Sequence, residues 1–188
     1  MQIPPKQITL RGGRFALLRS AEPEDAAFML EHLRQTSGET DYLARYPEEV
    51  QMTEEEEAAF IRFYLEDPEN FMLTAWINGQ LAATASLNRL RDLTKYRHRG
   101  EFGISVRKKY QGMGLGSIMT RICLYIAQNT SLEQVELSVS SGNAAAIHVY
   151  EKLGFRKVGA IPRAYRLKDG TYFDEILMVC DTRKEQSL

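Results

Sequence analysis

The sequence predicts a mixed α/β (α+β) domain, with a central, mostly antiparallel mixed sheet of about seven strands and about four flanking helices. Three observations lead to this fold class. The 188 residues suffice for one full hydrophobic core, so we expect a single domain over residues 1–188. Apolar residues make up 44% and charged residues 26%, which is ordinary globular composition. Strand-like and helix-like segments alternate, with hairpins early and late around a strand–helix–strand–helix–strand core.

The first elements are a strand or hairpin and a helix. Apolar and basic residues alternate around two glycines over residues 8–18, which indicates an opening strand or hairpin. Ser20 is a candidate N-cap and Pro23 stands in a first helical turn, so we expect a helix to about Gln35. Residues 36–50 show no sustained periodicity and are expected to form a loop.

A second helix and a hairpin follow. Thr53 has a glutamate three residues later, the pattern of a capping box, and Asp67-Pro68 ends the helix. Two β-rich runs over residues 71–77 and 81–87 are joined by Asn78-Gly79. This dipeptide favours a tight two-residue turn, so the runs are predicted to form a β-hairpin.

The second half of the chain is predicted to contain four strands and two helices. These are a strand over 100–106, a helix after a glycine loop at 111–116, a strand over 135–139, a helix capped by Asn143 and ended by Gly154, and strands over 157–167 and 172–180. The turn Lys168-Asp169-Gly170 joins the last two strands into a hairpin.

Composition excludes several functional classes. The net charge of −1 gives no reason to expect binding to nucleic acid or to a membrane. Cys123 and Cys180 each stand in an apolar run, which indicates neither a disulfide framework nor a metal site. No apolar window approaches the roughly 18 residues of a membrane span, and no export leader pattern occurs near Met1. We therefore expect a cytoplasmic protein without a metal.

The glycine loop has the composition of an anion site. Glycines at alternate positions allow close backbone approach, and the N–H groups of the helix that follows lie at its positive end. The expected guest is a phosphate or pyrophosphate, although such a loop can also be a purely structural turn. The spacing is neither that of a P-loop nor that of a dinucleotide-binding fingerprint. The residues are Gln111, Gly112, Met113, Gly114, Leu115, Gly116 and Ser117, and basic residues at 97–99 and 107–109 are expected to form a rim around them.

A second motif occupies the helix that begins at Asn143. Asn143 and Tyr150 are seven residues apart, which is two helical turns, so both project from one face. Three alanines between them keep that face low enough for a long, thin ligand. The alternative interpretation makes Asn143 only a helix cap and Tyr150 only a core residue.

The two motifs in this order resemble the GNAT superfamily of acetyl-CoA-dependent N-acetyltransferases. The resemblance covers residues 71–180 well and the first 70 residues only by element order. It implies that acetyl-CoA is the cosubstrate and that the glycine loop cradles its pyrophosphate. It also implies that the backbone of Ile104, Ser105 and Val106 pairs with the pantetheine arm, that Asn143 bonds this arm, and that Tyr150 faces the sulfur.

The chemistry implied by this resemblance requires an acid and a base. A primary amine arrives protonated, so a base must remove a proton before the amine attacks the thioester. Glu101, on the strand before the glycine loop, is the candidate base, directly or through water, and Tyr150 is the candidate acid for the departing thiolate. Direct attack in a ternary complex needs no covalent intermediate, so Cys123 is better interpreted as core.

The resemblance implies an acceptor that is a small-molecule or peptide amine, which the sequence does not identify. Residues 21–69 hold 15 of the 25 acidic and 3 of the 24 basic residues, and Glu39, Asp41, Glu48 and Glu49 fall in the expected loop. These acids form either a solvated surface or a wall that attracts a cationic acceptor. A non-catalytic acyl-CoA-binding module and a nucleotide-binding regulatory domain are the alternative functions. A homodimer through the last two strands is a further expectation.

Overall fold

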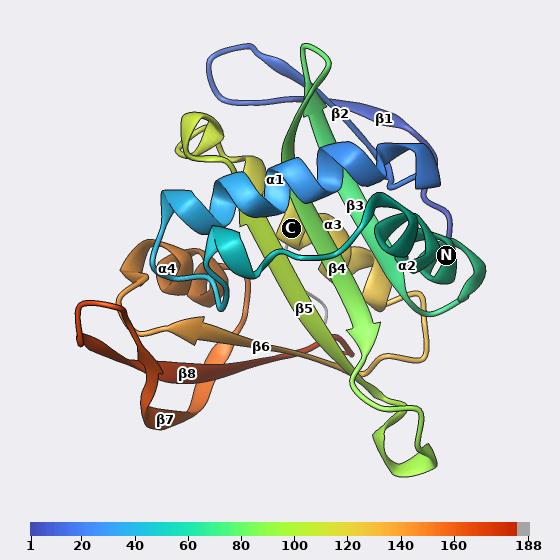
Figure 1. Cartoon of the computed structure of the whole chain (residues 1–188). Coiled ribbons are helices and arrows are strands. Elements are labelled where there is room, and N and C mark those ends of the chain that lie inside the picture. The colour runs from blue at the N-terminus through green and yellow to red at the C-terminus, as the bar shows by residue number, and fades with distance from the viewer. Residues whose placement is uncertain (184–188) are drawn as a thin grey trace.

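The computed structural model describes residues 1–183, which form one eight-stranded sheet and four α-helices (Figure 1). The strands are β1 (Lys6–Thr9), β2 (Phe15–Ser20), β3 (Phe71–Ile77), β4 (Gln80–Arg89), β5 (Arg99–Val106), β6 (Gln134–Ser140), β7 (Arg156–Arg166) and β8 (Tyr172–Asp181). The helices are α1 (Ala26–Glu39), α2 (Glu54–Glu66), α3 (Leu115–Ala127) and α4 (Ala144–Lys152). No helix among the described residues is long and apolar enough to cross a membrane.

The sheet is mixed and mostly antiparallel, which confirms the predicted fold class. Its strand order is β1-β2-β3-β4-β5-β6-β8-β7, and of these pairs β5 and β6 are parallel whereas the others are antiparallel. The prediction of about seven strands falls one short. The opening segment is a hairpin of two strands, β1 and β2, and this hairpin supplies the additional strand.

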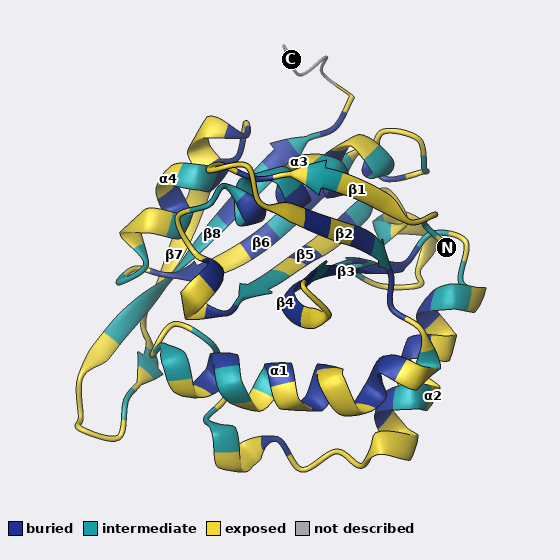
Figure 2. Ribbon diagram, turned by 90° about the horizontal axis from the view of Figure 1, so that it is seen from above, coloured by how far each residue is buried: buried dark blue, intermediate teal, exposed yellow. Residues whose placement is uncertain are grey.

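Helices cover both faces of the sheet. In Figure 2, α1 and α2 lie on one side and α3 and α4 on the other. The larger core packs with α3 and α4 and includes Phe71, Met119 and Met178, whereas the smaller core packs with α1 and α2 and includes Ile61 and Met72. Phe71 and Met72 are neighbours on β3, and successive strand residues point to opposite faces, so one strand serves both cores.

Several local signals have the predicted effect. Thr53 Oγ1 accepts a hydrogen bond from Glu56 N at 3.2 Å, and the Glu56 carboxylate accepts one from Thr53 N at 2.9 Å, which completes the capping box at α2. Asn78 and Gly79 have φ of 50° and 73°, as a tight hairpin turn requires. Gly154, with φ of 93°, follows α4 as predicted.

The start and end of α1 differ from the prediction. Ser20 is not a helix cap, because its Oγ accepts a hydrogen bond from Ile3 N at 2.7 Å, and a 3-10 turn over Pro23–Asp25 precedes the helix. The helix continues to Glu39 instead of ending near Gln35. Thr36 is buried and Glu39 accepts a hydrogen bond from Lys108 N at 2.6 Å, so tertiary contacts stabilise a segment of weak helix propensity.

Strands β5 and β6 diverge, and this divergence positions the candidate site. They pair through three residue pairs, of which Glu101 and Glu136 form the last. Beyond this pair β6 keeps its partner β8 up to Ser140, whereas β5 continues to Val106 paired with β4 alone. Figure 1 shows the two strands separating toward the end of β5. We call this opening, from Glu101 to Val106, the strand gap.

Candidate active site

The glycine loop lies at the end of β5 and begins α3. Gly112 and Gly114 have φ of 75° and 83°, a backbone conformation that requires glycine, and Gly114 is the N-cap of α3. Gly116 is different, because its φ is not positive and a Cβ there would meet Val106 Cγ2 at 3.8 Å, an ordinary contact. Neither packing nor backbone geometry requires glycine at 116. A ligand that approaches the first turn of α3 accounts for the bare backbone, so the loop fits a pyrophosphate.

The open edge of β5 presents Ile104, Ser105 and Val106, the residues that the family resemblance assigns to the pantetheine arm. All three residues are half-buried, and this edge has no partner strand among the described residues. The Val106 carbonyl accepts a hydrogen bond from Gln111 Nε2 at 3.1 Å. Gln111 therefore fastens the end of the strand to the glycine loop.

The basic residues expected around the glycine loop are mostly elsewhere. Arg107 is buried and its guanidinium donates to Glu31 of α1 at 3.2 Å. Arg99 is the first residue of β5 and Arg97 precedes the strand, and the eight strand residues at about 3.3 Å each place both more than 20 Å from the loop. Arg99 instead forms two hydrogen bonds with Glu136.

Two arginines that sequence reasoning missed approach the loop from the β1–β2 hairpin. Arg11 N donates to Met113 O at 3.1 Å, and the Arg11 side chain lies 3.7 Å from the position of a Cβ on Gly114. Arg14 Nη1 contacts Met113 Sδ at 3.9 Å. The hairpin is about one hundred residues away in sequence, so no local pattern indicates this contact.

Asn143 caps α4, with its Oδ1 accepting from Ala146 N at 3.2 Å. The interpretation of Asn143 as a helix cap is therefore correct for its side-chain oxygen. None of the described residues accepts a hydrogen bond from the Asn143 amide nitrogen, so this nitrogen is free to donate to a ligand.

Tyr150 packs in the core beside the strand gap. It is 9% exposed, and its ring lies edge-on to that of Phe102 on β5 with centroids 6.3 Å apart. Burial raises the pKa of Tyr150 to about 12, so the phenol is protonated at neutral pH. No described residue forms a hydrogen bond with its hydroxyl. Tyr150 is therefore a core residue whose hydroxyl is protonated and can donate a hydrogen bond to a ligand.

Glu101 lies at the point where β5 and β6 separate. Its side chain is exposed and lines a cavity of about 550 Å³ on the sheet face that carries α1 and α2. We call it the sheet cavity. Since Phe102 and Tyr150 occupy the opposite face, Glu101 and Tyr150 flank β5 from its two sides.

A buried histidine network supports the same strand from beneath α1. His32 is 1% exposed, and its Nε2 lies 2.8 Å from Ser105 Oγ, which in turn lies 3.1 Å from Thr84 Oγ1. Burial, with the nearby charge of Arg107, lowers the pKa of His32 to about 4. The sequence around His32 gives no indication of this network, because its partners Ser105 and Thr84 come from two distant strands.

Comparisons with known proteins agree with this geometry. Residues 34–155 match the model of the acetyltransferase (GNAT) family. The chain is 30% identical over 107 residues to the L-amino acid N-acetyltransferase AaaT of Escherichia coli (strain K12), covering 56% of this chain and 65% of that protein. It is 32% identical over 95 residues to the spermidine N(1)-acetyltransferase of the same strain, covering 50% of each. The chain thus spans less than two thirds of either relative.

Solved structures share the fold. An acetyltransferase of the GNAT family from Streptococcus pneumoniae superposes with a TM-score of 0.82 at 31% identity, covering 87% of this chain and 97% of that one. The structure of yncA, a putative acetyltransferase from Salmonella typhimurium with its cofactor acetyl-CoA, gives a TM-score of 0.78 at 20% identity, covering 91% and 96%.

Proposed function

This chain belongs to the acetyltransferase (GNAT) family, and on that premise we propose that it transfers the acetyl group of acetyl-CoA to an amine. The observation that carries the proposal is the strand gap, which brings the open edge of β5, the glycine loop and Tyr150 to one opening that begins at Glu101. The glycine loop would hold the pyrophosphate and the edge of β5 the pantetheine arm. Bound acetyl-CoA supplies an activated acetyl thioester.

The residues around the gap have separate roles in the proposed reaction. Glu101 takes the proton of the ammonium group, directly or through water, and the neutral amine then attacks the acetyl carbonyl. A backbone N–H of β5 stabilises the oxyanion that forms. The C–S bond breaks and Tyr150 protonates the thiolate, and the proton that the attacking nitrogen loses as the amide forms returns to the Tyr150 oxygen, directly or through water. Direct attack in a ternary complex requires no covalent intermediate on the protein, because binding both reactants together already lowers the entropic barrier.

The test is an acetyl-transfer assay with acetyl-CoA and a panel of amines, with detection of free thiol and of the acetylated product. We expect thiol release that depends on the amine. In the Glu101→Gln variant we expect a turnover loss of roughly 10²- to 10⁴-fold at neutral pH, with partial recovery as the pH approaches the pKa of the amine. Coenzyme A binding without acetyl transfer to any amine would instead indicate the non-catalytic acyl-CoA-binding module.

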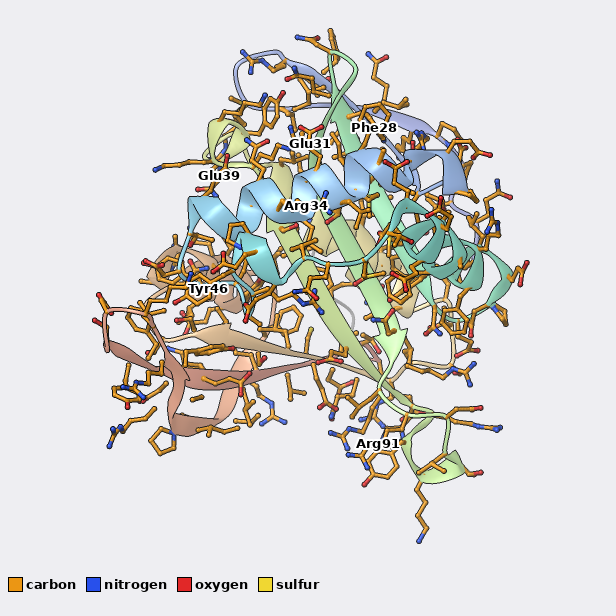
Figure 3. The ribbon with its side chains drawn as sticks, in the orientation of Figure 1. Phe28, Glu31, Arg34, Glu39, Tyr46 and Arg91 are labelled. Atoms are coloured by element: carbon orange, nitrogen blue, oxygen red, sulfur yellow. The ribbon has the colours of Figure 1, made fainter. Side chains whose placement is uncertain are left out.

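The acidic residues of the loop expected after the first helix favour a cationic acceptor when only the sequence is considered. We do not include a cationic acceptor in this proposal. Glu39 accepts a hydrogen bond from Lys108 N at 2.6 Å, Glu48 pairs with Lys168, and Glu49 accepts one from Tyr46 N at 2.7 Å. In Figure 3, Glu39 points toward the end of β5, and Tyr46 lies near the tip of the β7–β8 hairpin. These carboxylates hold the α1–α2 loop in place.

The relatives are named for an amino acid and for a polyamine, so their names do not define the acceptor. The homodimer also stays a prediction.

A further inference from the structure

The sheet cavity contains five ionic side chains, and three of them are satisfied by protein neighbours. Arg99 and Glu136 form a two-fold hydrogen-bonded ion pair, and Glu175 accepts a hydrogen bond from the Tyr165 hydroxyl at 3.0 Å. The other two are Glu101 and Arg156. Among the described residues, none forms an ion pair or a hydrogen bond with either side chain. Arg99 and Glu136 neutralise each other, whereas Glu175 is bonded only to a neutral phenol and keeps its charge. The cavity therefore presents the uncompensated negative charges of Glu101 and Glu175 and the uncompensated positive charge of Arg156.

Glu101 and Arg156 lie in one row of paired residues that crosses the sheet. Glu101 on β5 pairs with Glu136 on β6, Glu136 with Val179 on β8, and Val179 with Arg156 on β7. Residues paired in register share a face, so all four side chains project to the same side. Three strand spacings of about 4.8 Å separate the backbones of Glu101 and Arg156 by about 14 Å. Glutamate and arginine side chains are long enough to shorten this separation to the length of a small molecule when they lean toward each other.

We propose that the acceptor is a zwitterion of the α-amino acid class. Its ammonium group binds at Glu101 beside the strand gap, and its carboxylate binds the guanidinium of Arg156. The inference rests on the proposed function and names the substrate class of the same site. Along the row from Glu101 to Arg156 a polyamine fits less well, because its second positive charge would meet Arg156, whereas a carboxylate gives this arginine a charge-assisted partner.

Apolar residues that line the sheet cavity favour an acceptor with an apolar side chain. Leu177 and Val179 of β8 lie on the same face as the charged row, and Val158 of β7 is 48% exposed at the cavity. No helix covers this part of the sheet in Figure 1. An apolar amino acid side chain would cover this surface and remove apolar area from water. L-leucine and L-methionine are therefore suitable probes.

The experiment compares acceptors that differ only in the carboxylate. L-Leucine, leucinamide and 3-methylbutan-1-amine share the isobutyl group and the carbon that bears the amine, and this carbon carries a carboxylate, a neutral amide or hydrogen. Their kcat/KM values are compared per unprotonated amine. We expect leucine to exceed both others by roughly 10- to 100-fold, the effect of a hydrogen bond to a charged group. In Arg156→Gln, leucine should lose this advantage through a raised KM, while 3-methylbutan-1-amine is unaffected. Arg156→Lys should restore part of it.

The matched control is Lys157→Gln. Lys157 is the next residue on β7 and points to the opposite face, where it forms an ion pair with Glu151 at 3.2 Å. The same change of charge there should leave the KM for leucine unchanged. Equal losses in both variants would indicate a general electrostatic effect and would overturn the assignment of Arg156.

A binding measurement separates this inference from the proposed function. Calorimetric titration of leucine and methionine into the protein saturated with coenzyme A should show binding that Arg156→Gln weakens. Acetylation of all amines without regard to the carboxylate, or a preference for spermidine, would overturn the inference and leave the proposed function standing. Amino acid binding that depends on Arg156 without any acetylation would support Arg156 as the carboxylate-binding residue and would remove the proposed function together with the acceptor role of the amino acid. Absence of both binding and acetylation would overturn both.

Discussion

At the scale of single residues, Tyr150 offers a substitution that separates packing from chemistry. Tyr150→Phe keeps the ring that packs against Phe102 and removes only the hydroxyl, which has no partner among the described residues. If the hydroxyl protonates the thiolate, turnover should fall roughly 10²- to 10⁴-fold while the affinity for acetyl-CoA changes little. Steady-state kinetics and calorimetry on the two proteins measure these quantities. A variant with the wild-type rate would reduce Tyr150 to a core residue.

His32 predicts a specific dependence of stability on pH. Its pKa is about 4 in the folded protein and near 6.5 when unfolded, so between these values the unfolded state binds more protons. The contribution of the neutral His32 side chain to the free energy of unfolding is therefore fully present above pH 6.5 and is lost as the pH falls toward 4. The contribution lost between pH 6.5 and pH 5 is on the order of 2 kcal/mol.

Denaturant unfolding at pH 7.5 and pH 5 tests this contribution. The His32→Gln variant should lose less stability than the wild type over this interval, because it lacks the titrating group. His148→Gln on the exposed side of α4 is the matched control and should follow the wild type. Parallel pH profiles for wild type and His32→Gln would contradict the assigned pKa.

At the scale of secondary-structure elements, the first turn of α3 predicts opposite changes in stability and binding. Gly116→Ala places a Cβ where the protein itself has room, and alanine stabilises a helix relative to glycine by roughly 0.5–1 kcal/mol. If the first turn of α3 holds the pyrophosphate, the same Cβ would stand between the backbone and that group. We expect the Tm to rise while the affinity for coenzyme A falls roughly 10-fold or more through lost charge-assisted hydrogen bonds. Unchanged affinity in the folded variant would remove the loop from the cofactor site.

The elements predicted best from sequence are those whose signals are local. The capping box at Thr53 and the Asn78-Gly79 turn need only neighbouring residues, and both form as predicted. The end of α1 depends on burial beneath residues far away in sequence. Ser20 likewise bonds Ile3 of another segment, so the cap inferred from its position is wrong.

At the scale of the whole molecule, the parts of the candidate site that are continuous in sequence were predictable. The parts that the pairing of distant strands brings together were not. The glycine loop and the helix from Asn143 are continuous motifs. The pairing that brings Arg156 of β7 into one row with Glu101 of β5 requires the strand order, in which β8 lies between β6 and β7. Periodicity does not reveal that order. The contact of Arg11 with the glycine loop depends on folding in the same way.

The placement of positive charge around the glycine loop leads to the last prediction. Coenzyme A is a polyanion, so its binding should weaken as salt rises from about 0.05 M to 0.5 M and the Debye length falls. At low salt, the double substitution Arg11→Gln and Arg14→Gln should weaken coenzyme A binding roughly 3- to 10-fold and flatten the salt dependence, because both side chains lie at the loop. Arg97→Gln is the control. Arg97 lies beyond the other end of β5, where it pairs with Asp92 at 3.6 Å, so its loss should leave the dissociation constant unchanged. Calorimetry over a salt series measures both effects, and a larger loss in Arg97→Gln than in the double variant would mean that coenzyme A enters at the opposite end of the strand gap.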